Sequence, residues 1–322
     1  MNIFVTGATG VVGRRLVPKL IDAGHNVAAL SRSPENAARL QEVGAGPVPV
    51  SLFDAAALQR ALPGQDVVIN LATHIPSSSM RALLPWAWSE NDRIRKVGSA
   101  TIANAALASG VRRFIQESFA PVYPDCGDRW IDETTPIAPV KYNRTVASAE
   151  GTAHAFMKGE RDAVVLRFGA FYGPDSAHIR EMMGFIARGW APLPSDPAAF
   201  ISPISHDDAA AAVAAALNAP PGVYNVVDDE PMRRRDYFGA LAEALNVAPP
   251  KIPPHWFSYL MGSLGALLAR SQRISNRRLR AATPWRPIHP SVREGWPATI
   301  RQIREHHTAF RNELGASPPP RP

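Results

Sequence analysis

The amino-acid sequence predicts an α/β protein built on a doubly wound parallel sheet, followed by a smaller and mostly helical lobe. Short, β-branched apolar runs alternate with helix-length amphipathic segments through the first half of the chain. The apolar runs are nearly uninterrupted, which is typical of strands that helices cover on both faces. After about residue 170 this alternation is lost, and glycine and proline interrupt the chain. The change of pattern indicates a second structural unit.

The first half contains enough elements for a sheet of six or more strands. We predict strands over residues 2–7, 26–31, 47–52, 66–72, 112–118 and 162–168. We predict the intervening helices over residues 11–23, 35–43, 55–62, 91–109 and 142–158.

The second half is interpreted as a substrate-binding lobe. An alanine-rich helix is expected over 205–219 and another helix over 232–246, with a strand at 222–228 between them. We therefore divide the chain into a dinucleotide-binding domain, a substrate-binding lobe and a disordered, proline-rich tail. Their bounds are 1–170 (with strand 222–228 joining this domain), 171–310 and 311–322.

Composition describes an ordinary globular protein of 322 residues with a single cysteine, Cys126, so an internal disulfide is excluded and a reducing compartment fits. Met1 and Asn2 lead directly into the first predicted strand, and we expect no signal peptide. The most apolar segment, 259–269, is shorter than the roughly 20 residues that cross a bilayer. We expect a cytoplasmic protein without a membrane contact.

The net charge is +7, and arginines concentrate late in the chain. This late arginine cluster consists of Arg270, Arg273, Arg277, Arg278, Arg280 and Arg286. It could form a solvated face, or it could hold a phosphate or carboxylate of a ligand, because guanidinium pairs with both bidentately. No aromatic residues interleave with it as single-strand binders require, so we do not expect nucleic acid as a partner.

A glycine-rich loop follows the first predicted strand and opens the first helix. Gly7, Gly10 and Gly13 are spaced GxxGxxG, which allows a tight turn and brings a helix N-terminus against a pyrophosphate. Thr9, Val11, Val12 and Arg14 belong to the same loop. A strand before the loop and a helix after it predict a dinucleotide site in a Rossmann domain.

The end of the second strand indicates which dinucleotide is bound. A carboxylate there would bind a free ribose 2′-hydroxyl, whereas an arginine accommodates a 2′-phosphate. The chain has Ser31, Arg32 and Ser33 at this point, and Arg14 could reach the same phosphate. The sequence therefore favours NADP(H) over NAD(H). We also assign to the cofactor site residues at or after the ends of other strands: Leu52, Leu71, Ala72, Thr73, Phe168 and Gly169.

These motifs together resemble the extended short-chain dehydrogenase/reductase family, in its NAD(P)-dependent epimerase/dehydratase branch. The resemblance rests on the TGxxGxxG loop, "DVVINLA" at 66–72, "GVRRFIQES" at 110–118, Tyr142 with Glu150, and "VVLRFGAFYGP" at 164–174. The segment "SNRRLRAATPWRPIHPSVREGW" at 275–296 is similar to the closing segment of the branch. The resemblance covers about residues 2 to 300, and it implies the fold and the cofactor more firmly than the reaction.

The family's catalytic set is an Asn, a Ser or Thr, and a Tyr-xxx-Lys pair, and this chain keeps only Tyr142 at its expected place. Phe119 occupies the Ser/Thr position, Arg95 the Asn position and Val146 the Lys position. The family's lysine lowers the tyrosine pKa. A cation about 4 Å away at a dielectric near 20 is worth about 4 kcal/mol, or about three pKa units. Without it we expect Tyr142 to stay near pKa 10 and to donate hydrogen bonds rather than act as a base.

The candidate catalytic residues are Tyr142, His74 and Ser118. His74 follows the fourth strand, and histidine is a natural general acid or base. Ser118 and Glu117 end the fifth strand, at the edge where such sheets bind ligands, and Tyr123 lies in the next loop. We find no metal-ligand spacing and no nucleophile motif.

Three functions remain open at this point. The first is an NADP-dependent oxidoreductase or epimerase that acts on a small carbonyl or hydroxyl substrate without the usual Tyr-Lys pair. The second is a non-catalytic sensor of the NADP redox state. The third is a non-redox cyclase, isomerase or dehydratase on the same scaffold. The resemblance also implies a homodimer formed through helices 91–109 and 142–158.

Overall fold

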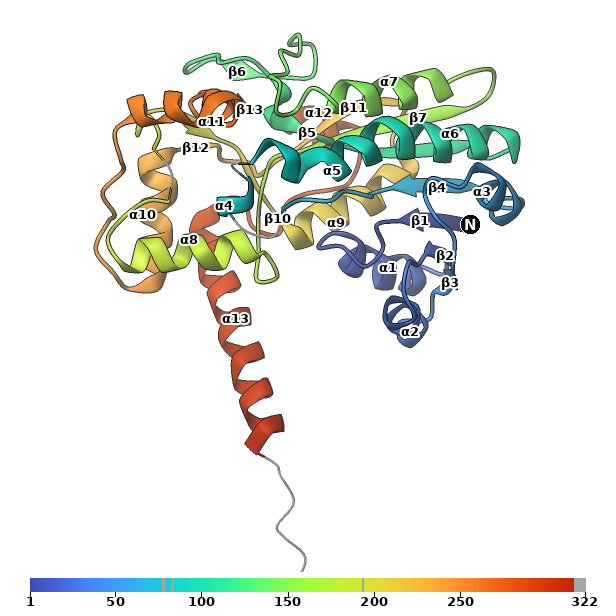
Figure 1. Ribbon diagram of the computed structural model, residues 1–322, viewed down its shortest axis with the longest axis horizontal. Helices are drawn as coiled ribbons and strands as arrows, with labels where there is room; N and C mark the ends of the chain where they lie inside the picture. Colours follow the sequence, from blue (N-terminus) through green and yellow to red (C-terminus); the bar gives the residue numbers. More distant parts are fainter. Residues whose placement is uncertain (77–78, 83, 193, 316–322) are drawn as a thin grey trace, which may run out of the picture.

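A seven-stranded parallel sheet organises the part of the chain that the structure describes (Figure 1). The computed structural model describes residues 1–76, 79–82, 84–192 and 194–315. The strand order is β11-β7-β5-β4-β1-β2-β3. The strands are β1 (Asn2–Thr6), β2 (Asn26–Leu30), β3 (Gly46–Val48), β4 (Val67–Asn70), β5 (Arg113–Phe119), β7 (Asp162–Phe168) and β11 (Gly222–Val226). The doubly wound sheet is as predicted, and β11 joins it beside β7.

Helices cover both faces of this sheet, and each face has its own apolar core. One face carries α1 (Gly13–Asp22), α2 (Pro34–Glu42) and α9 (His206–Ala215). The other carries α3 (Ala55–Ala61), α6 (Ser99–Ala108) and α7 (Val146–Phe156). All seven strands are parallel, so their carboxyl ends lie at one edge, where ligands of such sheets bind. Because α9 packs against α1, residues 206–215 belong to this layer and not to the second lobe, where we had placed them.

Two predicted elements of the first half differ from the observed ones by four residues at one end. The strand expected over 47–52 ends at Val48, because Pro49 has no N–H to donate to a neighbouring strand. The helix expected from residue 142 begins only at Val146, and residues 141–145 form turns. Tyr142 and Val146 therefore do not stand one turn apart on the same helix.

The helix expected over 91–109 is interrupted by a π-helical turn. It consists of α5 (Ser89–Arg93), the π-helix η2 (Ile94–Gly98) and α6, without a break in the chain direction. The short helices α4 (Ser79–Ala82) and η1 (Pro85–Trp88) precede it. A π-helical turn widens the helix locally and is frequently found at functional sites.

The second lobe has a separate apolar core in which aromatic rings pack together. Tyr172 and Trp296 have ring centroids 4.9 Å apart, and Tyr237 lies 5.5 Å from Trp296. The lobe contains α8 (Ala177–Ala187), α10 (Arg234–Leu245), η5 (His255–Met261) and α11 (Gly262–Leu268). Its strands are short and paired in twos: β8 (Ala170–Tyr172) with β10 (Pro203–Ser205), and β9 (Phe200–Ile201) with β12 (Met232–Arg233).

The last helix, α13 (Val292–Gly315), begins in this core and projects away from the body of the molecule (Figure 1). Residues 311–315, which we expected in the disordered tail, are helical. The proline-rich composition starts only after them, and residues 316–322 lie outside the described part. Within the described ranges, no helix is both long enough and apolar enough to cross a membrane.

Candidate active site

The glycine-rich loop is packed so closely that side chains are excluded from it. Gly7 has φ +70°, and a Cβ there would lie 2.5 Å from the carbonyl oxygen of Leu71. A Cβ on Gly13 would overlap the carbonyl of Gly7 and the backbone of Ala8. The amide of Gly10 donates to the carbonyl of Gly7 at 3.0 Å, which closes the turn. Sequence and structure thus agree that this is a tight loop leading into the N-terminus of α1, where a pyrophosphate fits.

Arg14, beside the loop, faces the second lobe. Its side chain is half exposed and lies 3.4 Å from Asp175, while Arg15 pairs with the same carboxylate at 2.5 Å and with Asp207 at 2.8 Å. These arginines hold the pKa of the Asp175 carboxyl below its usual range, even though burial acts to raise it. The ion pairs join α1 to the loop after β8.

The end of β2 presents the groups predicted to select the cofactor. Ser31 is buried and donates its hydroxyl to the carbonyl of Ser33 at 3.0 Å. Ser33 in turn caps α2 by accepting the amide of Asn36 at 3.3 Å. Arg32 is exposed between them, and no ion pair to it is found within the described ranges. An exposed guanidinium that has no carboxylate partner among the described residues suits a phosphate ligand.

The remaining predicted cofactor residues divide into two groups. Leu71, Ala72 and Thr73 follow β4 beside Gly7, and Leu52 packs on Gly98 of η2. Phe168 is fully buried, with its ring 5.3 Å from that of Phe171, so it has no surface for a ligand.

Gly169 is buried as well, because its amide donates to Val226 on the neighbouring strand and a Cβ would meet Ser202. Phe168 thus belongs to the core of the sheet, and Gly169 packs against Ser202 at the end of β7.

Tyr142 lies in the turn before α7 and packs against the opposite helix. Its ring makes an edge-to-face contact with Trp88 at 4.5 Å. Burial raises the pKa of the Tyr142 phenol well above its ordinary value, and the nearby charge of Arg95 partly opposes this effect. We predicted an ordinary pKa; burial instead raises the pKa, so even less phenolate is present near neutrality. It can donate a hydrogen bond but will not abstract a proton near neutrality.

Arg95 is a residue whose importance the sequence did not reveal. It is buried on η2 and forms an ion pair with Glu117 at 3.0 Å, from the end of β5. Sequence comparison identified it only as a replacement for an asparagine. Its neighbours Arg93 and Lys96 are exposed whereas Arg95 is buried, a difference that the sequence alone does not show.

His74 and Ser118 are not brought together with Tyr142 by any contact among the described residues. His74 is exposed, and its backbone amide donates to Asn91 at 3.0 Å. Ser118 is buried and donates its hydroxyl to Glu150 on α7 at 2.5 Å. The hydroxyl of Ser118 therefore points beneath α7.

Glu150 is the centre of a buried polar network that includes Ser118. Arg167 donates to both carboxylate oxygens of Glu150, each at 2.7 Å, and to the hydroxyl of Tyr123 at 2.7 Å. Tyr123 donates onward to Asn225 at 2.8 Å, and burial raises its pKa to about 12. Such a satisfied network holds α7 against β5, β7 and β11.

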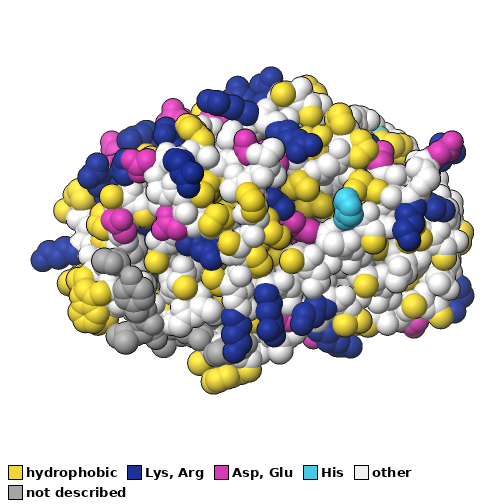
Figure 2. Space-filling model, turned by 90° about the horizontal axis from the view of Figure 1, so that it is seen from above, with side chains coloured by type: hydrophobic (Ala, Val, Ile, Leu, Met, Phe, Trp, Pro, Cys, Tyr) yellow, Lys and Arg dark blue, Asp and Glu magenta, His cyan; other side chains and the backbone are white. Residues whose placement is uncertain are grey.

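The late arginine cluster is divided among several internal contacts. Arg280 pairs with Asp229 at 2.8 Å, and Arg270 donates to the carbonyl of Tyr123 at 2.6 Å. Arg273 covers the ring of Trp130 at 4.1 Å. Figure 2 shows that lysine and arginine side chains are spread over the face it displays, with apolar side chains gathered near its middle.

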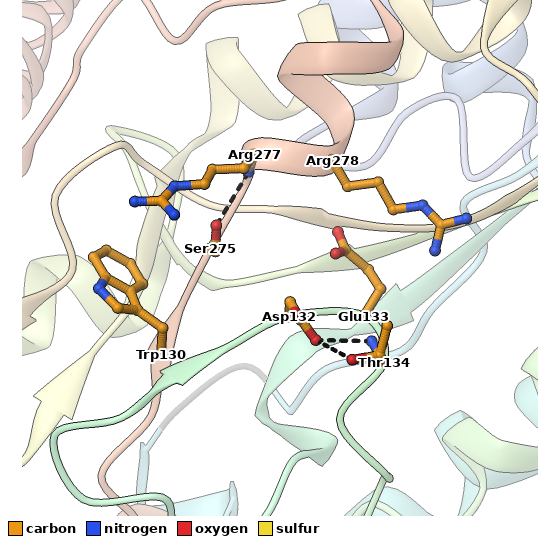
Figure 3. A pocket seen from close by; sticks show the side chains of 7 residues that line it. All are labelled: Trp130, Asp132, Glu133, Thr134, Ser275, Arg277 and Arg278. Carbon is orange, nitrogen blue, oxygen red and sulfur yellow. Dashed lines mark hydrogen bonds between the residues drawn. The ribbon is translucent and has the colours of Figure 1, made fainter.

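Two arginines of this cluster line a cavity of about 400 Å³. The cavity lies where β6 (Trp130–Ile131) pairs with β13 (Arg273–Ile274), near the start of α12 (Arg277–Ala282). Its lining consists of Trp130, Asp132, Glu133, Thr134, Ser275, Arg277 and Arg278 (Figure 3). Acidic and basic groups both face it, and Figure 1 shows β6 on the opposite side of the sheet from α1. This cavity is separate from the dinucleotide loop.

Comparisons with known proteins agree with this geometry. Residues 3–226 match the NAD dependent epimerase/dehydratase family. The 3-diazoavenalumate denitrifying reductase of a Streptomyces species is 32% identical over 306 residues, which make up 92% of this chain and 99% of that protein.

Two solved structures have a similar fold. Human epimerase family protein SDR39U1, solved with NADPH, has a TM-score of 0.77 at 20% identity and covers 94% of this chain and 99% of its own. Thermus thermophilus UDP-glucose 4-epimerase, solved with NAD, has a TM-score of 0.74 at 24% identity, with the same two coverages of 94% and 99%.

The loop that only glycine can form and the long alignment with the Streptomyces reductase lead to the same conclusion. This chain belongs to the NAD dependent epimerase/dehydratase family, and it is an NAD(P)-dependent enzyme of the oxidoreductase and epimerase type.

Proposed function

We propose that this protein is an NADP(H)-dependent reductase of a small molecule, with Tyr142 as the proton donor. The observation that carries the proposal is the combination of an intact phosphate loop with a tyrosine that cannot act as a base. Gly7, Gly10 and Gly13 keep the space for a pyrophosphate, and bound NADPH would supply the hydride. Val146 stands where the family has its lysine, and burial raises the Tyr142 pKa.

Reduction makes a weaker demand on the tyrosine than oxidation or epimerisation. An alcohol is oxidised only if a base takes its proton, and a phenol with a raised pKa does this poorly. Reduction of a carbonyl needs a donor for the oxygen, which a protonated Tyr142 provides. The site therefore favours the reductive direction, in agreement with the name of the Streptomyces relative.

A second candidate reaction is the reductive removal of nitrogen from an aromatic diazonium compound. The Streptomyces relative is named for a diazo substrate and for a denitrifying reduction, and its alignment spans nearly both chains. In such a reaction a hydride replaces the diazonium group, which leaves as N₂, so the charges balance without any proton at an oxygen. The absence of the family's lysine and of its Ser/Thr would therefore not impair this reaction.

Replacement of Tyr142 by phenylalanine separates the two reactions. We expect carbonyl reduction to fall about 10²- to 10⁴-fold, the usual contribution of a positioned acid, while diazonium reduction should be unaffected. Both are followed by substrate-dependent loss of NADPH absorbance, with the NADPH dissociation constant as the control. If the wild-type protein binds NADPH but oxidises it with neither class, the reductase proposal is wrong. The sensor and the non-redox enzyme would then remain.

Replacement of Arg32 by alanine tests the preference for NADP(H). We expect the affinity for NADPH to fall at least about tenfold, or 1.4 kcal/mol, because the exposed guanidinium at the end of β2 would pair with the 2′-phosphate. The affinity for NADH should not change. Calorimetric titration with both dinucleotides measures these affinities. The matched control is Arg39→Ala, which removes an exposed arginine that lies in α2. Equal losses for NADPH and NADH would argue against a 2′-phosphate contact.

A further inference from the structure

The turn that carries Tyr142 is held against the helix on the other side of the site by two contacts. The Tyr142 ring packs on Trp88 at 4.5 Å. Three residues later, Thr145 donates its hydroxyl to the carboxylate of Asp92 on α5 at 2.7 Å. The π-helix η2, which continues α5, also packs against α7. The phenol is therefore fixed relative to the segment 88–98 rather than to α7 alone.

Arg95 lies three residues after Asp92, in the π-helix η2 that packs against α7. Glu117, from the end of β5, pairs with Arg95 at 3.0 Å and holds the guanidinium in place. Side-chain exposure is only 7% for Arg95 and 11% for Glu117, so water screens this charge weakly.

The charged groups on the described segments that meet at Tyr142 differ in their exposure and in their partners. Lys141 and Arg144 lie on its own turn but are exposed, and their charges are screened. Asp92 is engaged by Thr145, and Glu117 by Arg95. Of these groups, Arg95 acts on the pKa of Tyr142, and it acts downward against the effect of burial.

We propose that Arg95 takes the place of the family's lysine, providing from the opposite helix the positive charge that Val146 cannot provide. It is a positioning residue that acts through Tyr142. When the O–H bond of Tyr142 breaks and its proton passes to the substrate oxygen, the positive charge of Arg95 stabilises the electron pair left on the phenolate. Water then returns a proton to Tyr142. The proposal rests on the proposed reductase function, but its first test does not require turnover.

The first test measures the phenol directly. 3,5-Difluorotyrosine, whose phenol ionises near neutrality, is placed at position 142 in the full-length protein, and its absorbance is titrated. The double variant Arg95→Gln with Glu117→Gln, called here the neutral pair, removes both charges and keeps side chains of similar size. In this variant we expect the phenol pKa to rise by about one unit. Arg95→Lys, which keeps the charge, should leave it near the wild-type value. An unchanged phenol pKa in the neutral pair overturns the proposal.

A second variant keeps the test decisive if the neutral pair does not fold. Exchanging the two residues, Arg95→Glu with Glu117→Arg, preserves an ion pair but moves the positive charge to β5. We expect the phenol pKa to rise in this variant too, because the negative group now occupies η2. A phenol pKa equal to that of the wild type would overturn the proposal. NADPH binding serves as the check that each variant is folded.

The third measurement is a double-mutant cycle on carbonyl reduction. In the wild-type background, the neutral pair should lower kcat about 10- to 100-fold with little change in KM or in NADPH affinity. In the Tyr142→Phe background the same change should have little further effect, because the charge acts through the phenol. Equal losses in both backgrounds would indicate a structural role and contradict the proposal. If no carbonyl is turned over at all, the reductase function fails, and the phenol titration still decides the role of Arg95.

Discussion

Replacement of Gly13 by valine is expected to abolish dinucleotide binding. A Cβ at this position overlaps the carbonyl of Gly7 and the backbone of Ala8, neither of which can move without opening the loop. The amides that would face the pyrophosphate are then displaced from the N-terminus of α1. We expect the dissociation constant of NADPH to rise about 100-fold or more, which corresponds to about 2.7 kcal/mol. Calorimetric titration measures it.

Gly239→Ala is the matched control for this substitution. Gly239 lies in α10 with nothing near the position of an added Cβ. Alanine there should leave NADPH binding unchanged and stabilise the helix by up to about 1 kcal/mol. Binding that survives Gly13→Val would mean that the cofactor is not held by this loop, and the redox proposals would lose their foundation.

Replacement of Glu150 by alanine is expected to cause the largest loss of stability. Glu150 accepts hydrogen bonds from Ser118 and from two nitrogens of Arg167. Its removal leaves the guanidinium of Arg167, only 7% exposed, without its carboxylate. Breaking a buried ion pair from one side costs about 3–5 kcal/mol, so we expect the free energy of unfolding, measured in urea, to fall by that amount.

An exposed ion pair of similar length provides the comparison. Arg233 and Asp128 are 2.8 Å apart, but the Asp128 side chain is 68% exposed. Asp128→Ala should therefore cost less than about 1 kcal/mol. If Glu150→Ala and Asp128→Ala destabilise the protein equally, the network around Glu150 does not hold α7 to the sheet as described above.

The parts of the fold that depend on local chain properties could be predicted from the sequence. Apolar runs mark the buried strands, and Gly7 and Gly13 mark a loop where only hydrogen fits. Pro49 could have marked the end of β3, because the lack of an N–H is a property of the residue itself. The start of α7 was not predictable in this way, since Thr145 binds Asp92 on another helix and holds the preceding turn out of helical geometry.

The parts of the site that depend on tertiary contacts could not be predicted. Phe168 ends a strand and looked accessible, but it is buried in the core between the sheet and the helices α1 and α9. Arg95 and Glu117 are 22 positions apart in the chain, and only the packing of η2 beside β5 makes them a pair. The pKa of Tyr142 likewise follows from burial under Trp88 and its neighbours, which the spacing of residues along one helix does not reveal.

The π-helical turn has a consequence for how this site is recognised in related chains. Each residue of a helix turns the chain by about 100°, so removing one residue between Ile94 and Gly98 would rotate Arg95 about the helix axis relative to α6. The guanidinium would then face a different neighbour although its own codon is unchanged. An insertion or deletion in this turn therefore changes the chemistry of the site as much as a substitution does. Relatives should accordingly be compared by the length of this segment as well as by its residues.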